Sequence, residues 1–135
     1  IVEGQGTDTP ILGVLNGIFY NAATTLKPTF ANHYVQVTPA NSEDIDAFVL
    51  DNPQQQYVVA IDAALAQAGY LETYDMNASA GSLSTGQSSA TLDHNDTSAD
   101  GASWRLLRSA EDPENDENAA FRSVVVVANL IELQN

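Results

Sequence analysis

The chain has no cysteine, only four basic residues and no long hydrophobic run. Without cysteine there can be no disulfide, no thiolate metal site and no cysteine nucleophile. The shortage of lysine and arginine argues against nucleic acid as a partner, because binding it depends on neutralising phosphates. It argues equally against a polybasic membrane contact. No apolar stretch approaches the roughly 20 residues of a transmembrane helix.

The remaining composition is that of an acidic globular domain. At 135 residues and 44% apolar residues, the chain is expected to form one folded domain with its own core. It carries 18 acids against four bases, a net charge of −14. Such a charge keeps copies soluble and mutually repelling, and it suits a salty medium, as in a marine or halophilic source. The chain starts at Ile1 without a basic, signal-like segment, which suggests processing or a start after an unrecorded tail.

Short apolar and β-branched stretches separated by turn residues predict a mainly β fold. We expect a small barrel or sandwich of short antiparallel strands, with one short helix and an extended N-terminal arm. The arm is residues 1–10, which contain two glycines and no periodicity, and residues 11–135 form a single β-rich domain. The helix is expected at 63–68, capped by Asp62 and ended by Gly69, and a longer helix from Gln54 is the competing interpretation. The strands are expected within 10–21, 34–37, 47–50, 57–61, 90–92, 104–108 and 121–133, with a polar loop at 94–103.

Five carboxylates lie between Glu111 and Glu117, just before the apolar run 124–128. An EF-hand calcium loop alternates acids and then requires glycine, but here Pro113 intrudes and Glu117 stands at the glycine position. We therefore favour a solvated loop over a metal site. The acidic 93–101 stretch has the wrong order of residues for the same motif.

The other candidates for chemistry are isolated residues. His33 and His94 are the only imidazoles and have no clustered partner in the sequence. The glycine-rich 81–86 segment lacks the lysine of a phosphate-binding loop, and 86–90 lacks the second glycine of a nucleophile elbow. Arg105 and Arg108 are expected to pair with acids. We therefore expect no enzymatic activity, no cofactor and no metal.

Four segments occur in a fixed order: "ILGVLNGIFYN" (11–21), "KPTFANHY" (27–34), "DIDAFVLDNPQQQYVV" (44–59) and "STGQSSATLD" (84–93). Followed by "WRLL" and "VVVVANL", this order resembles small structural proteins of tailed bacteriophages, particularly marine ones, encoded close to the major capsid protein. The resemblance covers roughly residues 11–130. The chain departs from the pattern at Asn52, where a second acid is expected, and in the "ENDEN" run (114–118).

The resemblance implies a virion component, namely a head decoration (cement) protein on the outer surface of the major capsid lattice. Its partners would be the major capsid protein and further copies of itself, in a homo-oligomer or array. No catalytic residues are carried over from this family. The arm could add a strand to a neighbour's sheet edge. The residues expected to make contact lie in the arm and on two apolar stretches: Ile1, Val2, Ile11, Leu12, Phe19, Tyr20, Phe30 and Tyr34.

An alternative from another class is a secreted or surface β-domain, either a filament subunit or a carbohydrate-binding module. A filament subunit would lend its N-terminal segment as a donor strand. A sugar binder needs an exposed aromatic platform, for which the candidates are Trp104, Tyr70 and Tyr74.

Overall fold

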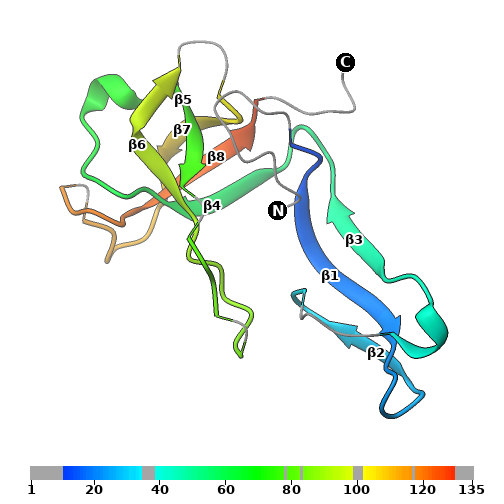
Figure 1. Cartoon of the computed structure of the whole chain (residues 1–135). Helices are drawn as coiled ribbons and strands as arrows, with labels where there is room; N and C mark the ends of the chain where they lie inside the picture. Colours follow the sequence, from blue (N-terminus) through cyan, green and yellow to red (C-terminus); the bar gives the residue numbers. More distant parts are fainter. Residues whose placement is uncertain are drawn as a thin grey trace.

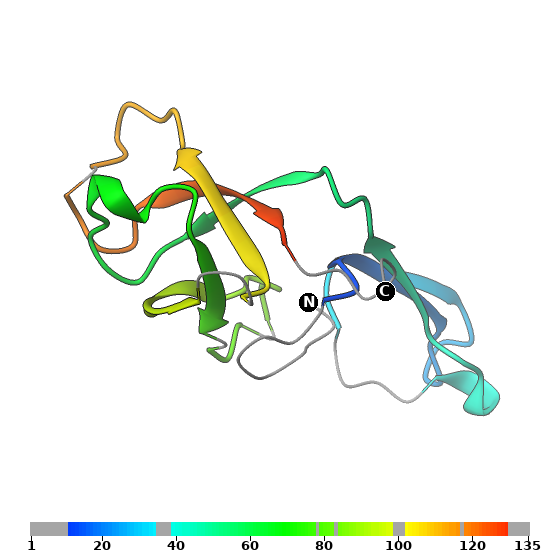
Figure 2. The same ribbon diagram turned by 90° about the horizontal axis from the view of Figure 1, so that it is seen from above.

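The computed structural model describes residues 11–34, 39–77, 79–82, 84–98, 102–116 and 118–129. This part of the chain is mainly β, as predicted, with eight strands in two antiparallel sheets and two short 3-10 turns. The two sheets form a sandwich-like arrangement and are clearly separate in the view from above (Figure 2). Among the described residues, no helix has both the length and the apolar character that crossing a lipid bilayer requires.

The first sheet has three strands in the order β2-β1-β3, and it projects away from the rest of the chain (Figure 1). β1 (Val14–Asn21) pairs with β2 (Pro28–Ala31) on one side and with β3 (Asp46–Leu50) on the other. A bulge shifts the β1–β3 register between Leu15 and Gly17. The 3-10 turn η1 (Ala40–Ser42) precedes β3.

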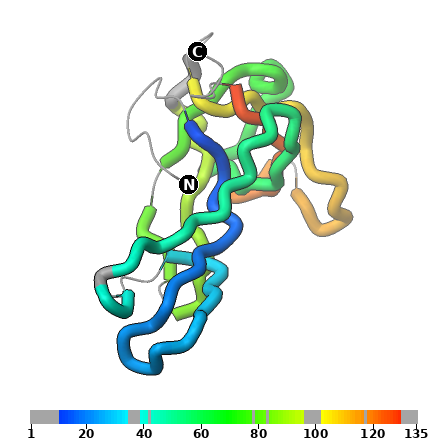
Figure 3. The backbone as a smooth tube through the Cα atoms, turned by 90° about the vertical axis from the view of Figure 1, so that its right-hand side faces the viewer, coloured from blue at the N-terminus to red at the C-terminus, as the bar shows by residue number. Residues whose placement is uncertain are grey.

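The second sheet has five strands in the order β4-β8-β7-β5-β6. Its bounds are β4 (Gln56–Ala60), β5 (Thr73–Asn77), β6 (Thr91–Ser98), β7 (Trp104–Ser109) and β8 (Ser123–Ala128). The 3-10 turn η2 (Gln67–Gly69) lies between β4 and β5. The long β5–β6 connection extends in the same direction as the three-stranded sheet, as both Figure 1 and Figure 3 show.

The five-stranded sheet curls until its two outer strands meet at one end. There, Ile61 and Leu92 form an isolated parallel bridge between the residue after β4 and β6. The Asp62 N–H donates to Leu92 O (3.1 Å), and the His94 N–H donates to Asp62 Oδ1 (2.8 Å). The result is a small, partly closed barrel. Its core consists of the buried side chains of Ile11, Ile61, Tyr74, Leu92, Trp104, Leu106, Val124 and Val126.

Five predicted strands are confirmed as β1, β3, β4, β7 and β8, and the strand predicted at 90–92 is confirmed as the start of β6. The predicted helix over 63–68 is wrong, since only the 3-10 turn Gln67–Gly69 forms and the described residues contain no α-helix. Asp62 does not cap a helix because its carboxylate binds the His94 N–H. The polar loop predicted at 94–103 is also wrong in its first half, where β6 continues to Ser98. The predicted strand at 34–37 and the arm at 1–10 lie almost wholly outside the described residues.

Candidate functional site

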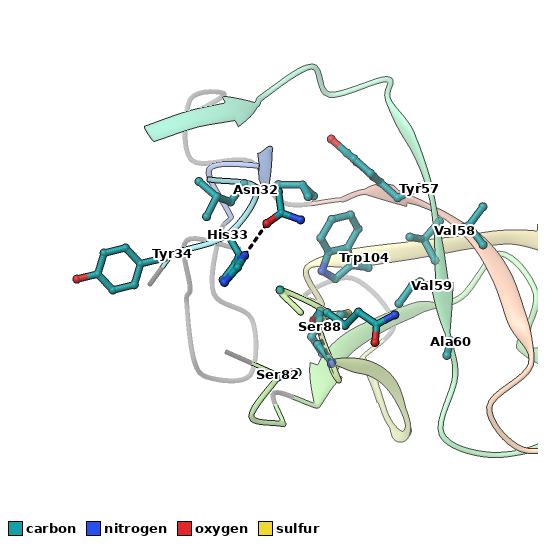
Figure 4. A pocket seen from close by; sticks show the side chains of 18 residues that line it. Asn32, His33, Tyr34, Tyr57, Val58, Val59, Ala60, Ser82, Ser88 and Trp104 are labelled. Carbon is teal, nitrogen blue, oxygen red and sulfur yellow. Dashed lines mark hydrogen bonds between the residues drawn. The ribbon is translucent and has the colours of Figure 1, made fainter. Parts of the chain in front are cut away.

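A cleft of about 550 Å³ opens into the barrel beside β4. This volume lies within the range of about 300–1,000 Å³ that is common for ligand pockets. One wall is β4, and the opposite wall is formed by residues 32–34 and parts of the 81–90 segment (Figure 4). Side chains from three further strands line its inner part: Met76, Trp104 and Val126.

The cleft runs along the edge of β4, because four consecutive residues of this strand, 57–60, line it. The Ile61 N–H donates to Arg122 O at 3.1 Å. In an antiparallel pair only every second residue is hydrogen-bonded to the partner strand, so this bond shows which residues of β4 are bonded to β8. Val59, two residues earlier, is the next residue bonded to β8. The main-chain N–H and C=O groups of Val58 and Ala60 therefore point away from β8. The Ala60 C=O takes part in the parallel Ile61–Leu92 bridge, whose other bond runs from the Asp62 N–H to Leu92 O, whereas the Val58 N–H, the Val58 C=O and the Ala60 N–H take no part in that bridge.

Trp104 brings a buried polar group to the lining of the cleft. Its side chain is only 3% exposed, and the Tyr57 ring meets it edge-on at a centroid distance of 5.6 Å. The indole Nε1–H is buried and has no hydrogen-bond acceptor among the described residues. A buried donor without an acceptor costs about 1–3 kcal/mol, so an acceptor brought to this group would stabilise the protein.

The wall opposite β4 is held together by contacts between two distant segments. His33 Nδ1–H donates to Asn32 Oδ1 at 2.5 Å, and both side chains lie against Gly86. Gly86 has φ +72°, and a Cβ atom there would collide with the His33 ring. Glycine is therefore required at this position for two reasons, its left-handed backbone and the close approach of the imidazole.

A second feature is the aromatic face of the three-stranded sheet, formed by Phe19, Phe30 and Phe48. In the sheet register, Phe19 pairs with Phe30 and Gly17 pairs with Phe48, so all three rings lie on the same face. The Phe30 and Phe48 rings are 6.0 Å apart, and their side chains are 61% and 49% exposed. The Phe30 ring lies over Gly17, where a Cβ atom would collide with it.

The opposite face of this sheet is covered. Ile18 is 2% exposed and Tyr20 is 9% exposed. At the end of β1, Ala22 forms a bridge with Pro39, and the Asn21 side chain, which alternation places on the same face as Phe19, donates to Glu43 Oε2 at 2.6 Å. The three-stranded sheet thus has one protected face and one aromatic face in contact with solvent.

The residues predicted to contact a capsid or a neighbouring subunit differ in how exposed they are. Phe30 and Tyr34 are exposed, at 61% and 54%, and Phe19 is half-buried. Tyr20 belongs to the covered face, and Ile11 is 3% exposed in the barrel core, so neither offers its side chain to a partner. Leu12, half-buried, follows Ile11. The two remaining residues, Ile1 and Val2, lie outside the described residues.

The acidic loop is a solvent-exposed turn organised by one uncharged residue. Asn115 Nδ2–H donates to Ser109 Oγ (3.0 Å), Ala110 O (3.1 Å) and Ser123 O (2.8 Å), while its Oδ1 accepts from the Ser123 N–H (2.8 Å). The carboxylates of Asp112 and Asp116 accept main-chain N–H groups two residues further on. The predicted loop is confirmed, and Asn115 joins it to the ends of β7 and β8.

The charged and imidazole side chains are dispersed. Among the described residues, no three His, Asp or Glu side chains are grouped so as to hold a metal ion. The predicted pairing of arginines with acids is confirmed for Arg108, whose guanidinium is 3.1 Å from Glu111. Arg105 donates instead to Asn129 Oδ1 at 3.2 Å. Arg122 is buried, donating to the Tyr70 hydroxyl at 3.0 Å and lying 5.6 Å from the centre of its ring.

Burial shifts the titration of two barrel tyrosines. The pKa of Tyr57 is raised above 10.0 mainly by desolvation and secondarily by the charge of Asp51. The pKa of Tyr74 is raised by desolvation and then by Glu72. Their hydroxyls donate to Leu50 O (3.2 Å) and Gly69 O (2.9 Å). Both tyrosines therefore remain neutral at physiological pH and act as hydrogen-bond donors, not as bases.

The sequence interpretation missed Phe48, the open edge at Val58 and the role of Trp104 in the cleft. The alternation in 56–60, with Tyr57 and Val59 packed against the core and Val58 68% exposed, was visible as a strand pattern. Nothing in that pattern says which strand stands at the edge of a sheet. Comparison of the chain with protein-family models, with curated protein sequences and with solved structures gives no match.

Proposed function

We propose that the chain is a virion structural protein, a capsid decoration (cement) protein that binds the outer surface of the major capsid lattice. The observation that carries this proposal is the aromatic face of the three-stranded sheet, with Phe30 and Phe48 exposed side by side. Exposed apolar clusters of this kind mark sites of association. The sheet projects from the barrel, so a partner can reach it without disturbing the main core (Figure 1).

Charge supports the same proposal. A net charge of −14 keeps free copies apart in solution, and attachment then depends on a specific apolar contact. Aromatic side chains are the residues that most often dominate such contacts. Many copies arranged on a repeating lattice would stabilise the shell by avidity even if each contact were weak.

Quantitative mass spectrometry of purified virions tests the position of the protein. A ratio near one copy per major capsid subunit is the expected result. A handful of copies per particle would assign the protein to the neck or tail, and its absence from virions would contradict the proposal.

Reconstitution tests the surface itself, with shells that lack this protein incubated with purified variants. Phe30→Ser combined with Phe48→Ser is expected to weaken binding by at least about tenfold, because these rings supply the apolar contact. Phe121→Ser is the matched control, since Phe121 is 66% exposed but belongs to the connection before β8. Equal loss in both variants, or in neither, would count against the aromatic face.

The alternative of a carbohydrate-binding module is not favoured by its proposed residues. Trp104 and Tyr74 are 3% and 1% exposed, and Tyr70 packs against Arg122. These three residues do not form the exposed platform that sugar rings stack on. Spontaneous polymerisation of the purified protein would instead favour the filament-subunit alternative.

A further inference from the structure

We propose that the open edge of β4 accepts an extended segment of a partner polypeptide as an added strand, with the segment uncharged and apolar at alternate positions. This inference does not depend on the proposed function, because it concerns the barrel edge and not the aromatic face. It would stand whether the partner is a capsid subunit or another protein.

The main-chain groups of β4 provide the template. Val58 turns its N–H and C=O away from β8, and Ala60, two residues further on, turns its N–H to the same side, while its C=O belongs to the Ile61–Leu92 bridge. A strand that pairs with an exposed edge uses this spacing, bonding to every second residue. Among the described residues, this edge is unpaired as far as the Ala60 N–H, because the barrel closes only at the Ile61–Leu92 bridge, which uses the Ala60 C=O.

The cleft also accommodates the side chains of such a strand. Alternate side chains of an added strand point to opposite faces of the sheet, so one set would enter the cleft. There it would meet Tyr57, Met76 and Trp104. A main-chain carbonyl of the occupant can accept the hydrogen bond that the buried Trp104 Nε1–H lacks among the described residues. That nitrogen is buried in this structure, so the bond can form only if neighbouring side chains move aside.

The charges indicate what kind of segment fits. No lysine, arginine, aspartate or glutamate is among the described residues that line the cleft, and His33 is its only imidazole. A charged side chain placed there would lose its hydration without gaining a partner. A second copy of the chain is a poor occupant, since each copy carries a net charge of −14 and would repel the other. We therefore assign the site to a neutral segment of a different protein.

The test uses the full chain and a panel of capped seven-residue peptides with valine, threonine or phenylalanine at alternate positions. Each peptide has a matched version that is N-methylated at every second residue, which keeps the side chains but removes main-chain donors. The chain has a single tryptophan, so the fluorescence and the indole N–H resonance of Trp104 report occupancy directly. We expect saturable binding below about 1 mM and a loss of at least about tenfold on N-methylation.

Amide exchange locates the contact. The Val58 and Ala60 amides are expected to exchange at least about tenfold more slowly in the complex, while the Val59 amide stays unchanged because it already faces β8. Val58→Pro removes one edge donor at an exposed position and is expected to abolish binding, whereas Val58→Ala keeps the donor and binds as the parent chain does. If the proline variant fails to fold, the N-methylated peptides still decide the question.

Three results would overturn the inference. One is equal binding of the parent and N-methylated peptides, which would make the cleft an apolar pocket without strand pairing. Another is no binding by any peptide at about 1 mM, a concentration at which even weak complexes form. The third is self-association in sedimentation experiments that Val58→Pro abolishes, which would assign the edge to a second copy.

Discussion

The two sheets are built from similarly apolar strands, yet one buries its large side chains and the other displays them. In the barrel, β8 places Val124 and Val126 at 0% and 1% exposure. In the three-stranded sheet, β3 leaves Phe48 and Leu50 at 49% and 44% exposure. The difference lies in what covers each strand, because the barrel closes on itself whereas only one face of the projecting sheet is covered. Stability is therefore concentrated in the barrel, and the surface for association lies on the projecting sheet.

The largest expected effect comes from a cavity in the barrel core. Leu106 is fully buried, so Leu106→Ala should lower the free energy of unfolding by about 2–5 kcal/mol. Phe30→Ala on the projecting sheet should change it by about 0.5 kcal/mol or less, because that ring is 61% exposed. Urea denaturation of both variants measures the contrast. Equal losses would mean that the aromatic face contributes to folding as much as the barrel core does.

A second effect concerns the side-chain amide that organises the acidic loop. Asn115→Ala removes four hydrogen bonds at the ends of β7 and β8 and should cost about 1–3 kcal/mol. Asn115→Asp should cost at least as much, since a carboxylate would face three oxygens that now accept from the amide. Asp112→Ala is the matched control in the same loop, because Asp112 accepts only the Glu114 N–H from its exposed turn. If Asp112→Ala lowered the free energy of unfolding by a similar amount, the stabilisation would come from the loop as a whole and not from Asn115.

A smaller change in the free energy of unfolding is expected at alkaline pH, and it should arise from two tyrosines of the barrel. Tyr57 and Tyr74 hold their protons more firmly in the folded chain than in the unfolded one, because their folded-state pKa is raised above 10.0. The stability they contribute is fully present below the ordinary tyrosine pKa of about 10 and is lost as pH rises through the raised pKa. Thermal melts of the parent chain at pH values above about 10 should show this loss. It should be reduced in Tyr74→Phe, and an unchanged profile in that variant would contradict the assignment.

The smallest effect is expected at the surface ion pair. Arg108 and Glu111 are 51% and 87% exposed, so Arg108→Ala should change stability by about 0.5 kcal/mol or less. Adding salt should stabilise the parent chain overall, because screening weakens the repulsion among its 18 acids. If Arg108→Ala lost much more stability than this at high salt, the ion pair would contribute more than a solvent-exposed pair is expected to.

Sequence patterns identified the strands that contain runs of apolar residues and missed all or part of the strands that contain polar residues. β8 and β7 were visible as apolar runs, whereas β5, which contains Asp75, was missed and β6 was predicted only at its start, before the polar residues that follow Leu92. Asp75 is buried in the sheet because its carboxylate accepts the Ser103 N–H at 2.9 Å. That partner is 28 residues away, so no local rule could have anticipated it.

The candidate site was predicted only in part, for a related reason. Phe30 and Tyr20 are both aromatic residues of adjacent strands, and the sequence does not separate them. The fold does so, because Phe30 pairs with Phe19 and shares its face of the sheet, whereas Tyr20 lies on the opposite face, where it is buried. Likewise, the cleft exists because β4 lies at the edge of the five-stranded sheet, which depends on strand order and not on composition.

The burial of Arg122 affects the repulsion between neighbouring copies of the protein. It is one of only four basic residues and is 4% exposed, so the exterior is more one-sidedly anionic than the composition suggests. Crowding many such copies onto a surface would draw dissolved cations into the gaps between them. The attainable density of copies should therefore follow the supply of counter-ions, with divalent cations acting at lower concentration than sodium.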